Sequence, residues 1–141
     1  MPTIEDAIEL ALRAHRGQRD KADAPYVLHP LRLLAHMTSE TEQMTAVLHD
    51  VVEDSDVSLD DLRAAGYPEE VVTAVDALTR RTDESYEAFI ARVKPNALAR
   101  RIKLADLEDN MDVRRIAEPT EKDLARLRRY RLAWSALLSP I

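Results

Sequence analysis

The stretch from His49 to Asp54 brings one imidazole and three carboxylates together in six residues, His49-Asp50-Val51-Val52-Glu53-Asp54. Successive side chains on an α-helix are offset by about 100°, so these four polar groups would share an arc of about 140°. The opposite arc is apolar: Met44, Val47, Leu48, Val51 and Val52. The spacing therefore predicts one packed face and one face able to bind a metal ion or move protons.

Two further polar residues extend this set, His29 at the expected start of one helix and Asp106 on a later helix. With His49 and Asp50 they would supply two imidazole nitrogens and two carboxylates. Such a mixed ligand set suits Mn, Fe, Co or Zn, and it leaves positions open for water or phosphate oxygens. A bound ion can lower the pKa of water and polarise a phosphoryl group. The four residues predict a metal site drawn from three helices.

Glu53 and Asp54 lie one turn beyond the His-Asp pair, where they could take a proton from the attacking water or give one to the leaving group. Adjacent carboxylates near a cation can hold different protonation states, as an acid/base pair requires. His15 and His36 have no acidic neighbour at helical spacing on a polar face. We assign those two histidines to capping or packing.

The composition predicts one all-α domain over residues 1–141, a compact bundle of about seven or eight helices. Two glycines and one phenylalanine argue against a β-sandwich, and the abundant Ala, Leu, Glu and Arg favour helix. We expect helices near residues 3–16, 30–38, 41–54, 58–66, 84–93 and 95–111, with Pro95 in a first turn, and others opening at Pro68 and Thr120.

The charge and hydropathy patterns exclude several classes of protein. The net charge of −6 argues against a nucleic-acid surface, and the absence of cysteine excludes thiolate chemistry. No apolar run approaches the roughly 20 residues that span a bilayer, and the acidic N-terminus does not resemble a secretion signal. We therefore expect a cytoplasmic protein with no membrane partner.

Trp134, Leu137 and Leu138 near the C-terminus could pack internally or against a second subunit, which leaves a homo-oligomer open.

Five strings, in this order, make the chain resemble a known family. They are Ala14-His15-Arg16-Gly17-Gln18, Pro25-Tyr26-Val27-Leu28-His29-Pro30-Leu31, Ala46-Val47-Leu48-His49-Asp50-Val51-Val52-Glu53-Asp54, Ala77-Leu78-Thr79 and Lys103-Leu104-Ala105-Asp106. They look like the H…HD…D signature of HD-domain metal phosphohydrolases. More narrowly, the chain resembles the hydrolase domain of the RelA/SpoT homologue family, which removes the 3′-pyrophosphate of guanosine tetraphosphate and pentaphosphate.

This resemblance implies an HD-type helical domain, a small nucleotide substrate and a role for each matched residue. The ligands of one catalytic manganese ion would be His29, His49, Asp50 and Asp106. Glu53 and Asp54 would handle the attacking water. The implied substrate contacts are Asn110 at the ribose, Lys21 in the loop that holds the base, and Tyr130 with Arg126 on the last helix.

The chain departs from the family pattern at three places. Asp20 precedes Lys21 where an arginine is typical, residues 22–24 read Ala-Asp-Ala where Ser-Gly-Glu is usual, and residues 107–109 read Leu-Glu-Asp where Arg-Leu-His is common. We expect all three changes to remove cationic or hydrogen-bonding groups from around the substrate and not from around the metal. Since no synthetase or regulatory domain follows, we expect a stand-alone hydrolase of the guanosine 3′,5′-bis(diphosphate) type.

Three alternatives stay open. An HD-domain phosphatase could act on another nucleotide, such as a nucleoside monophosphate or a phosphorylated dinucleotide. A nucleotide-binding sensor could keep the ligands without turnover, although it would not need both Glu53 and Asp54. A helical interaction protein, with its polar stripe merely solvated, would bind no stoichiometric metal.

Overall fold

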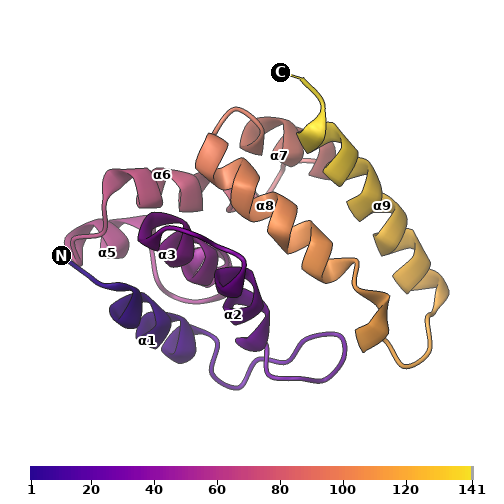
Figure 1. Cartoon of the computed structure of the whole chain (residues 1–141), viewed down its shortest axis with the longest axis horizontal. Helices are drawn as coiled ribbons and strands as arrows, with labels where there is room; N and C mark the ends of the chain where they lie inside the picture. The colour runs from indigo at the N-terminus through magenta and orange to yellow at the C-terminus, as the bar shows by residue number, and fades with distance from the viewer. Residues whose placement is uncertain (141) are drawn as a thin grey trace.

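The computed structural model describes residues 1–140, and within them the regular secondary structure is entirely helical (Figure 1). The α-helices are α1 (Ile4–Ala14), α2 (Leu28–Ala35), α3 (Glu40–Leu48), α4 (Val51–Asp54), α5 (Leu59–Ala64), α6 (Glu69–Ala77), α7 (Tyr86–Val93), α8 (Ala97–Asn110) and α9 (Glu121–Leu138), and a 3-10 turn, η1 (Val113–Arg115), precedes the last. The predicted all-α class is confirmed.

Side-chain caps fix where several helices begin. Thr3 with Asp6, Ser58 with Asp61 and Thr120 with Asp123 each form a reciprocal capping box, which satisfies backbone donors that the first turn leaves free. The expected place of Pro95 in a first turn is wrong. Asn96 caps α8 instead, with its side-chain oxygen 2.9 Å from the Ala99 nitrogen, so Pro95 lies outside the helix.

The expected continuous helix over residues 41–54 is divided in two. α3 ends at Leu48, α4 begins at Val51, and His49 and Asp50 form the junction between them. Asp50 leaves helical geometry, with φ −109° and ψ 0°. Counting α3 and α4 together gives eight α-helices within residues 1–140, inside the expected range of seven or eight. The break places the His-Asp pair at a bend and not along one face of a regular helix.

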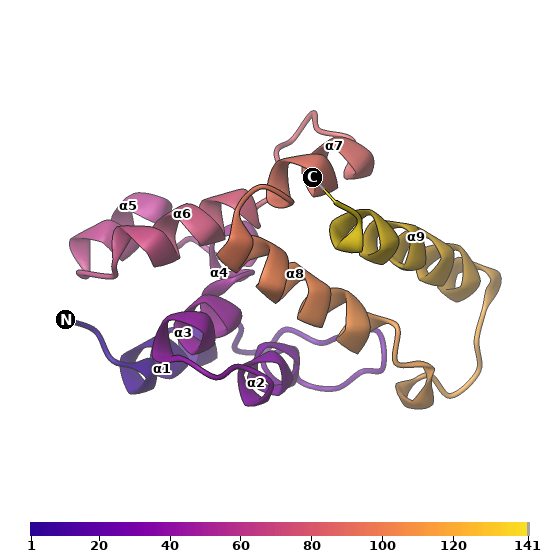
Figure 2. The same cartoon turned by 45° about the horizontal axis from the view of Figure 1, so that its top comes forward.

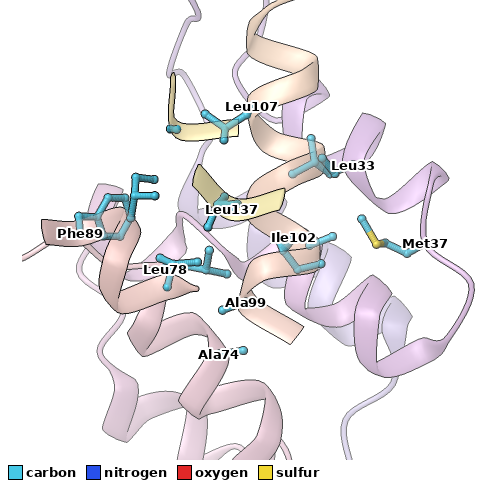
Figure 3. Packing of buried hydrophobic residues seen from close by; sticks show 14 residues of the cluster. Leu33, Met37, Ala74, Leu78, Phe89, Ala99, Ile102, Leu107 and Leu137 are labelled. Atoms are coloured by element: carbon cyan, nitrogen blue, oxygen red, sulfur yellow. The ribbon is translucent and has the colours of Figure 1, made fainter. Parts of the chain in front are cut away.

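Two clusters of buried side chains hold the helices together. Figure 3 shows the first, where side chains of α2, α6, α7, α8 and α9 converge, including Leu33, Ile102, Leu107 and Leu137. The second joins α1, α3, α5 and α6. Since Ala46 belongs to the first cluster and its neighbour Val47 to the second, α3 connects the two, and its C-terminal end is held from both sides.

α8 and α9 lie side by side, with α8 in the middle of the molecule and α9 on the side away from α1, as both Figure 1 and Figure 2 show. Of the apolar residues expected at the C-terminus, Leu137 is fully buried inside the chain, whereas Leu138 is 51 % exposed. Trp134 donates its indole N–H to Glu108 on α8, at 3.2 Å.

Within residues 1–140 no helix is both long and apolar enough to cross a membrane.

Candidate functional site

The structure brings the four expected metal ligands together from three parts of the chain. Candidate ligand atoms of His29 on α2 and of His49 and Asp50 at the α3–α4 junction all lie within 4.8 Å of one another. Asp106 on α8 adjoins them, with its Oδ1 2.8 Å from His29 Nε2 and 3.6 Å from His49 Nε2. His29, His49 and Asp106 are buried. Buried imidazoles and carboxylates at such distances can hold a divalent cation.

His49 supplies the test of whether an ion would fit. Its Nδ1 lies 2.6 Å from the Ala46 carbonyl, and because a carbonyl only accepts, Nδ1 carries the proton. Nε2 faces the carboxylates of Asp50 and Asp106, at 3.0 and 3.6 Å, and is buried without a well-aligned hydrogen bond among residues 1–140. A metal ion would satisfy this atom, and the second ring nitrogen is anchored as metal-binding histidines usually are. The residues present fit a cation.

The carboxylates of the group are held in their charged forms. Although burial opposes it, Lys103 and the two histidines hold the pKa of Asp106 well below its ordinary value. Lys103 Nζ lies 2.7 Å from Asp106 Oδ2. The carboxylates of Asp50 and Asp106 in turn raise the pKa of His49 well above its usual value, against the effect of burial. A bound cation would take the place of that proton, as metal ligation requires.

Two side chains connect this group to a neighbouring pocket. Tyr26 donates its hydroxyl to Asp50 Oδ2, and Asn110 donates its amide to Asp106 Oδ1 at 3.1 Å. Both residues also line a cavity of about 590 Å³ between the loop after α1 and the start of α9. A ligand in that pocket would therefore lie next to the metal-binding group. Tyr26 has no role among the sequence-based predictions, although it stands inside one of the five matched strings.

The four residues expected to contact substrate all line this cavity: Lys21, Asn110, Arg126 and Tyr130. Lys21 and Tyr130, from opposite ends of the chain, meet directly, with Nζ 3.1 Å from the phenol oxygen. Arg126 pairs with Asp123 at 2.5 Å. The cavity offers aromatic and apolar surface together with both signs of charge, which suits a nucleoside carrying phosphates.

Glu53 and Asp54 lie at the exposed edge of the site on α4. Glu53 is oriented by the backbone N–H of Arg80, which donates to Oε1 at 2.9 Å. Partial burial of the Asp54 carboxyl, with the charges of Asp50 and Glu53, raises its pKa to about 6. A carboxyl group with that pKa can exchange a proton near neutral pH.

We expected every departure from the family pattern to lie around the substrate, and the position of Asp109 shows that this is wrong. Its Oδ2 is 2.6 Å from His29 Nδ1, on the side of the ring opposite Asp106. Arg32 holds the same carboxylate from two nitrogens, at 2.8 and 3.0 Å, and Arg115 approaches it at 3.4 Å. Asp109 thus orients a candidate metal ligand. Sequence reasoning missed this role, although Asp109 follows Asp106 by three residues and so shares a helix face with it.

Asp20 organises the loop that carries Lys21. Its Oδ1 accepts the backbone N–H groups of Ala22 and Ala24, each at 2.9 Å, and its Oδ2 lies 3.6 Å from Arg115. The aspartate closes the turn in which Asp23 adopts a positive φ of 60°. Asp20 still lines the pocket, so this departure does place a carboxylate beside the expected substrate.

The two remaining histidines have structural positions, as expected. His15 is buried at the end of α1, with Nδ1 2.8 Å from Gln18 Oε1, and Gln18 in turn donates to the Asp54 carbonyl at 2.9 Å. His36 is the C-cap of α2 and is exposed.

Comparisons with known proteins find relatives in sequence and in fold. The chain is 36 % identical over 121 residues to a GTP pyrophosphokinase of Streptomyces coelicolor, covering 77 % of this chain but 14 % of that protein. It is 31 % identical over 127 residues to guanosine-3′,5′-bis(diphosphate) 3′-pyrophosphohydrolase MESH1 of Drosophila melanogaster, covering 82 % of this chain and 71 % of that protein. The solved structure of a metazoan ortholog of SpoT that hydrolyses ppGpp matches with a TM-score of 0.77 and 28 % identity, over 98 % of this chain and 87 % of that one.

The chain belongs to the RelA/SpoT homologue family. No protein-family model matches it. This RelA/SpoT homologue shares the helical fold of the metazoan SpoT ortholog over nearly its whole length.

Proposed function

We propose that this RelA/SpoT homologue is a metal-dependent hydrolase that removes the 3′-pyrophosphate of guanosine-3′,5′-bis(diphosphate), with residues 1–141 acting as one HD-type domain. One observation carries the proposal. Tyr26 and Asn110 line the cavity and are each hydrogen-bonded to a candidate metal ligand, so nucleotide pocket and ion site would be contiguous. The names of the relatives supply the substrate.

The proposed cofactor is one divalent ion bound by His29, His49, Asp50 and Asp106, with manganese preferred and Fe, Co, Zn or Mg compatible with the ligand set. When bound, such an ion polarises a phosphoryl oxygen and lowers the pKa of a water ligand. The orphaned Nε2 of His49 supports this assignment.

In the proposed reaction, water adds to the phosphorus nearest the ribose and the bond from that phosphorus to the 3′-oxygen breaks. Inorganic pyrophosphate departs, and the 3′-oxygen takes a proton to become a hydroxyl group. Glu53 and Asp54 would accept the proton of the water and return one to the 3′-oxygen. The pKa of Asp54, raised to about 6, suits that exchange.

Four residues would position the nucleotide in the cavity: Lys21, Asn110, Arg126 and Tyr130. Asn110 would face the ribose, because its amide also contacts Asp106 and must lie near the scissile bond. Lys21 and Tyr130, already in contact, would close the pocket across the ligand. We propose that this activity is cytoplasmic, as expected from the sequence.

The test is hydrolysis of guanosine-3′,5′-bis(diphosphate) by the purified protein with added Mn²⁺, followed as release of pyrophosphate. His49→Ala and Glu53→Ala should each lower the rate by about 100-fold or more, since general acid–base catalysis alone contributes about that much. His36→Ala, a histidine outside the site, is the matched control and should keep the wild-type rate. Equal background rates for the wild type and both site variants would refute the assignment. Other phosphorylated nucleotides assayed in parallel would then show whether a different substrate is used.

A further inference from the structure

The hydroxyl group of Tyr86 is buried without a hydrogen-bond partner among residues 1–140. Tyr86 is the first residue of α7, and its ring packs edge-on against Phe89 at 6.1 Å. A buried hydroxyl left unpaired costs about 1–3 kcal/mol, so such groups are normally paired with protein, water or a bound ligand. Burial raises the pKa of Tyr86, which keeps the hydroxyl protonated and available as a donor.

Three cationic side chains surround this ring: Arg80, Lys103 and Arg129. Their charged groups lie 5.7, 5.9 and 4.9 Å from the ring centroid. Lys103 is neutralised by Asp106 at 2.7 Å. Arg80 and Arg129 form no ion pair with a carboxylate within residues 1–140, and the Arg80 guanidinium donates only to the Glu84 carbonyl there, at 3.2 Å.

Ordinary cation–π packing accounts for only part of this arrangement. A single arginine over a tyrosine gains about 0.5–1 kcal/mol at an exposed site. Here two exposed guanidinium groups from different elements, neither paired with a carboxylate within residues 1–140, lie by one ring, and the hydroxyl of that ring has no partner there. An anion bound beside the ring would neutralise the arginines and give the hydroxyl an acceptor.

The cluster adjoins the proposed active site through three connections. Lys103 joins the Tyr86 ring to Asp106. The backbone N–H of Arg80 holds the Glu53 carboxylate. The guanidinium of Arg129 also lies 5.6 Å from the ring of Tyr130, which lines the nucleotide pocket.

We propose that Arg80, Arg129 and the Tyr86 hydroxyl form a phosphate subsite that binds the terminal phosphate of the diphosphate group being removed. Guanidinium groups bind phosphate oxygens through paired charge-assisted hydrogen bonds, and the phenol adds a third donor. The subsite lies beside Glu53 and Asp106, so it would hold the outer phosphate while the inner phosphorus faces the ion. The identity of the diphosphate rests on the proposed function; the anion site itself does not.

The test is calorimetric titration of the Mn²⁺-loaded protein with inorganic pyrophosphate. Arg80→Gln and Arg129→Gln should each weaken binding by about tenfold, as expected for loss of a hydrogen bond between charged groups. Tyr86→Phe, which removes only the oxygen, should weaken binding by about threefold. Arg128→Gln, the exposed neighbour on α9, is the matched control and should bind as the wild type does.

Unchanged affinity in Arg129→Gln and Arg80→Gln, or a loss equal to that in Arg128→Gln, would overturn the subsite. Thermal unfolding of each variant checks that the fold is intact, and Arg129→Lys, which keeps the charge, should lose less affinity than Arg129→Gln. If no nucleotide is hydrolysed but the two arginine variants lose pyrophosphate binding, the proposed function fails and the subsite stands. If hydrolysis is found and binding is equal in all variants, the subsite alone fails.

Discussion

His29 is held from both sides, which makes Asp109 important although it would not touch the ion. Asp106 approaches one ring nitrogen at 2.8 Å, and Asp109 approaches the other at 2.6 Å. Because Asp109 accepts from Nδ1, the lone pair of Nε2 would face the cation. Two nitrogens of the Arg32 guanidinium donate in turn to the Asp109 carboxylate. The orientation of the His29 ring therefore depends on how α2 packs against α8.

Removing this support should weaken metal binding more than it weakens the fold. We expect Asp109→Asn to lower the affinity for Mn²⁺ by about 10- to 100-fold, the usual effect of losing a partner that orients a metal-binding histidine. The measurement is calorimetric titration of the metal-free protein with Mn²⁺. Glu108→Gln, an exposed neighbour on the same helix, serves as the control. Equal affinities in the two variants would show that Asp109 does not orient His29.

The sequence identifies residue types well but not their long-range partners. His29, His49, Asp50 and Asp106 could be selected because their chemistry is unusual on helices, and the structure brings them together. The contacts of Tyr26 with Asp50 and of Asp109 with His29 join residues 24 and 80 positions apart. No local pattern encodes such a contact, because it depends on how the helices pack.

At the scale of elements, a partly exposed ion pair helps to hold the loop between α6 and α7. Arg92 on α7 contacts Glu84 through two nitrogens, at 2.8 and 2.9 Å, and also donates to the carbonyls of Ala77 and Thr79. This loop presents Arg80 to Glu53, so its conformation matters to the site. Hydrogen bonds from Arg92 and from the backbone of Arg81 lower the pKa of Glu84 to about 2.

The depressed pKa of Glu84 predicts how its contribution to stability depends on pH. The carboxylate stabilises the fold fully above its ordinary value of 4.5, and the contribution is lost as the pH falls from there through about 2. Glu84→Gln should therefore be less stable than the wild type at pH 7, and the difference should shrink below about pH 4.5. Urea unfolding at a series of pH values measures it. Glu87→Gln on α7 is the control; a pH-independent difference for Glu84→Gln would exclude the ion pair as the cause.

Helix boundaries were predictable where their signals are local. The three capping boxes need only residues three apart, and all three form where the sequence places them. The division of residues 41–54 was not predictable, because no proline or glycine interrupts this stretch. There His49 is buried between two packed clusters, and its Nδ1 bonds back to the Ala46 carbonyl. Packing around the polar pair therefore overrides helical periodicity at this junction.

At the scale of the molecule, the candidate ion site joins the two halves of the fold. His29 and Asp106 lie on helices of the first cluster, and the junction carrying His49 and Asp50 leads into Val51 of the second. Without an ion, these buried polar groups are held by one another and by neighbouring side chains, among them Lys103 and Asp109. A cation bound there would link α2, α3 and α8. Because the ligands come together only in the folded chain, the ion would bind the folded state and not the unfolded one.

Metal removal should consequently lower the stability of the whole protein. Mn²⁺ at 100 times its dissociation constant should stabilise the fold by about 2.7 kcal/mol, which corresponds to a rise in Tm of roughly 5–15 °C for a chain of this size. Addition of EDTA should reverse the shift, as followed by calorimetry. His49→Ala should abolish the Mn²⁺ response, whereas His36→Ala, at an exposed helix end, should retain it. A shift of the same size in both variants would mean that the ion binds elsewhere, since only one of them removes a nitrogen from the buried group.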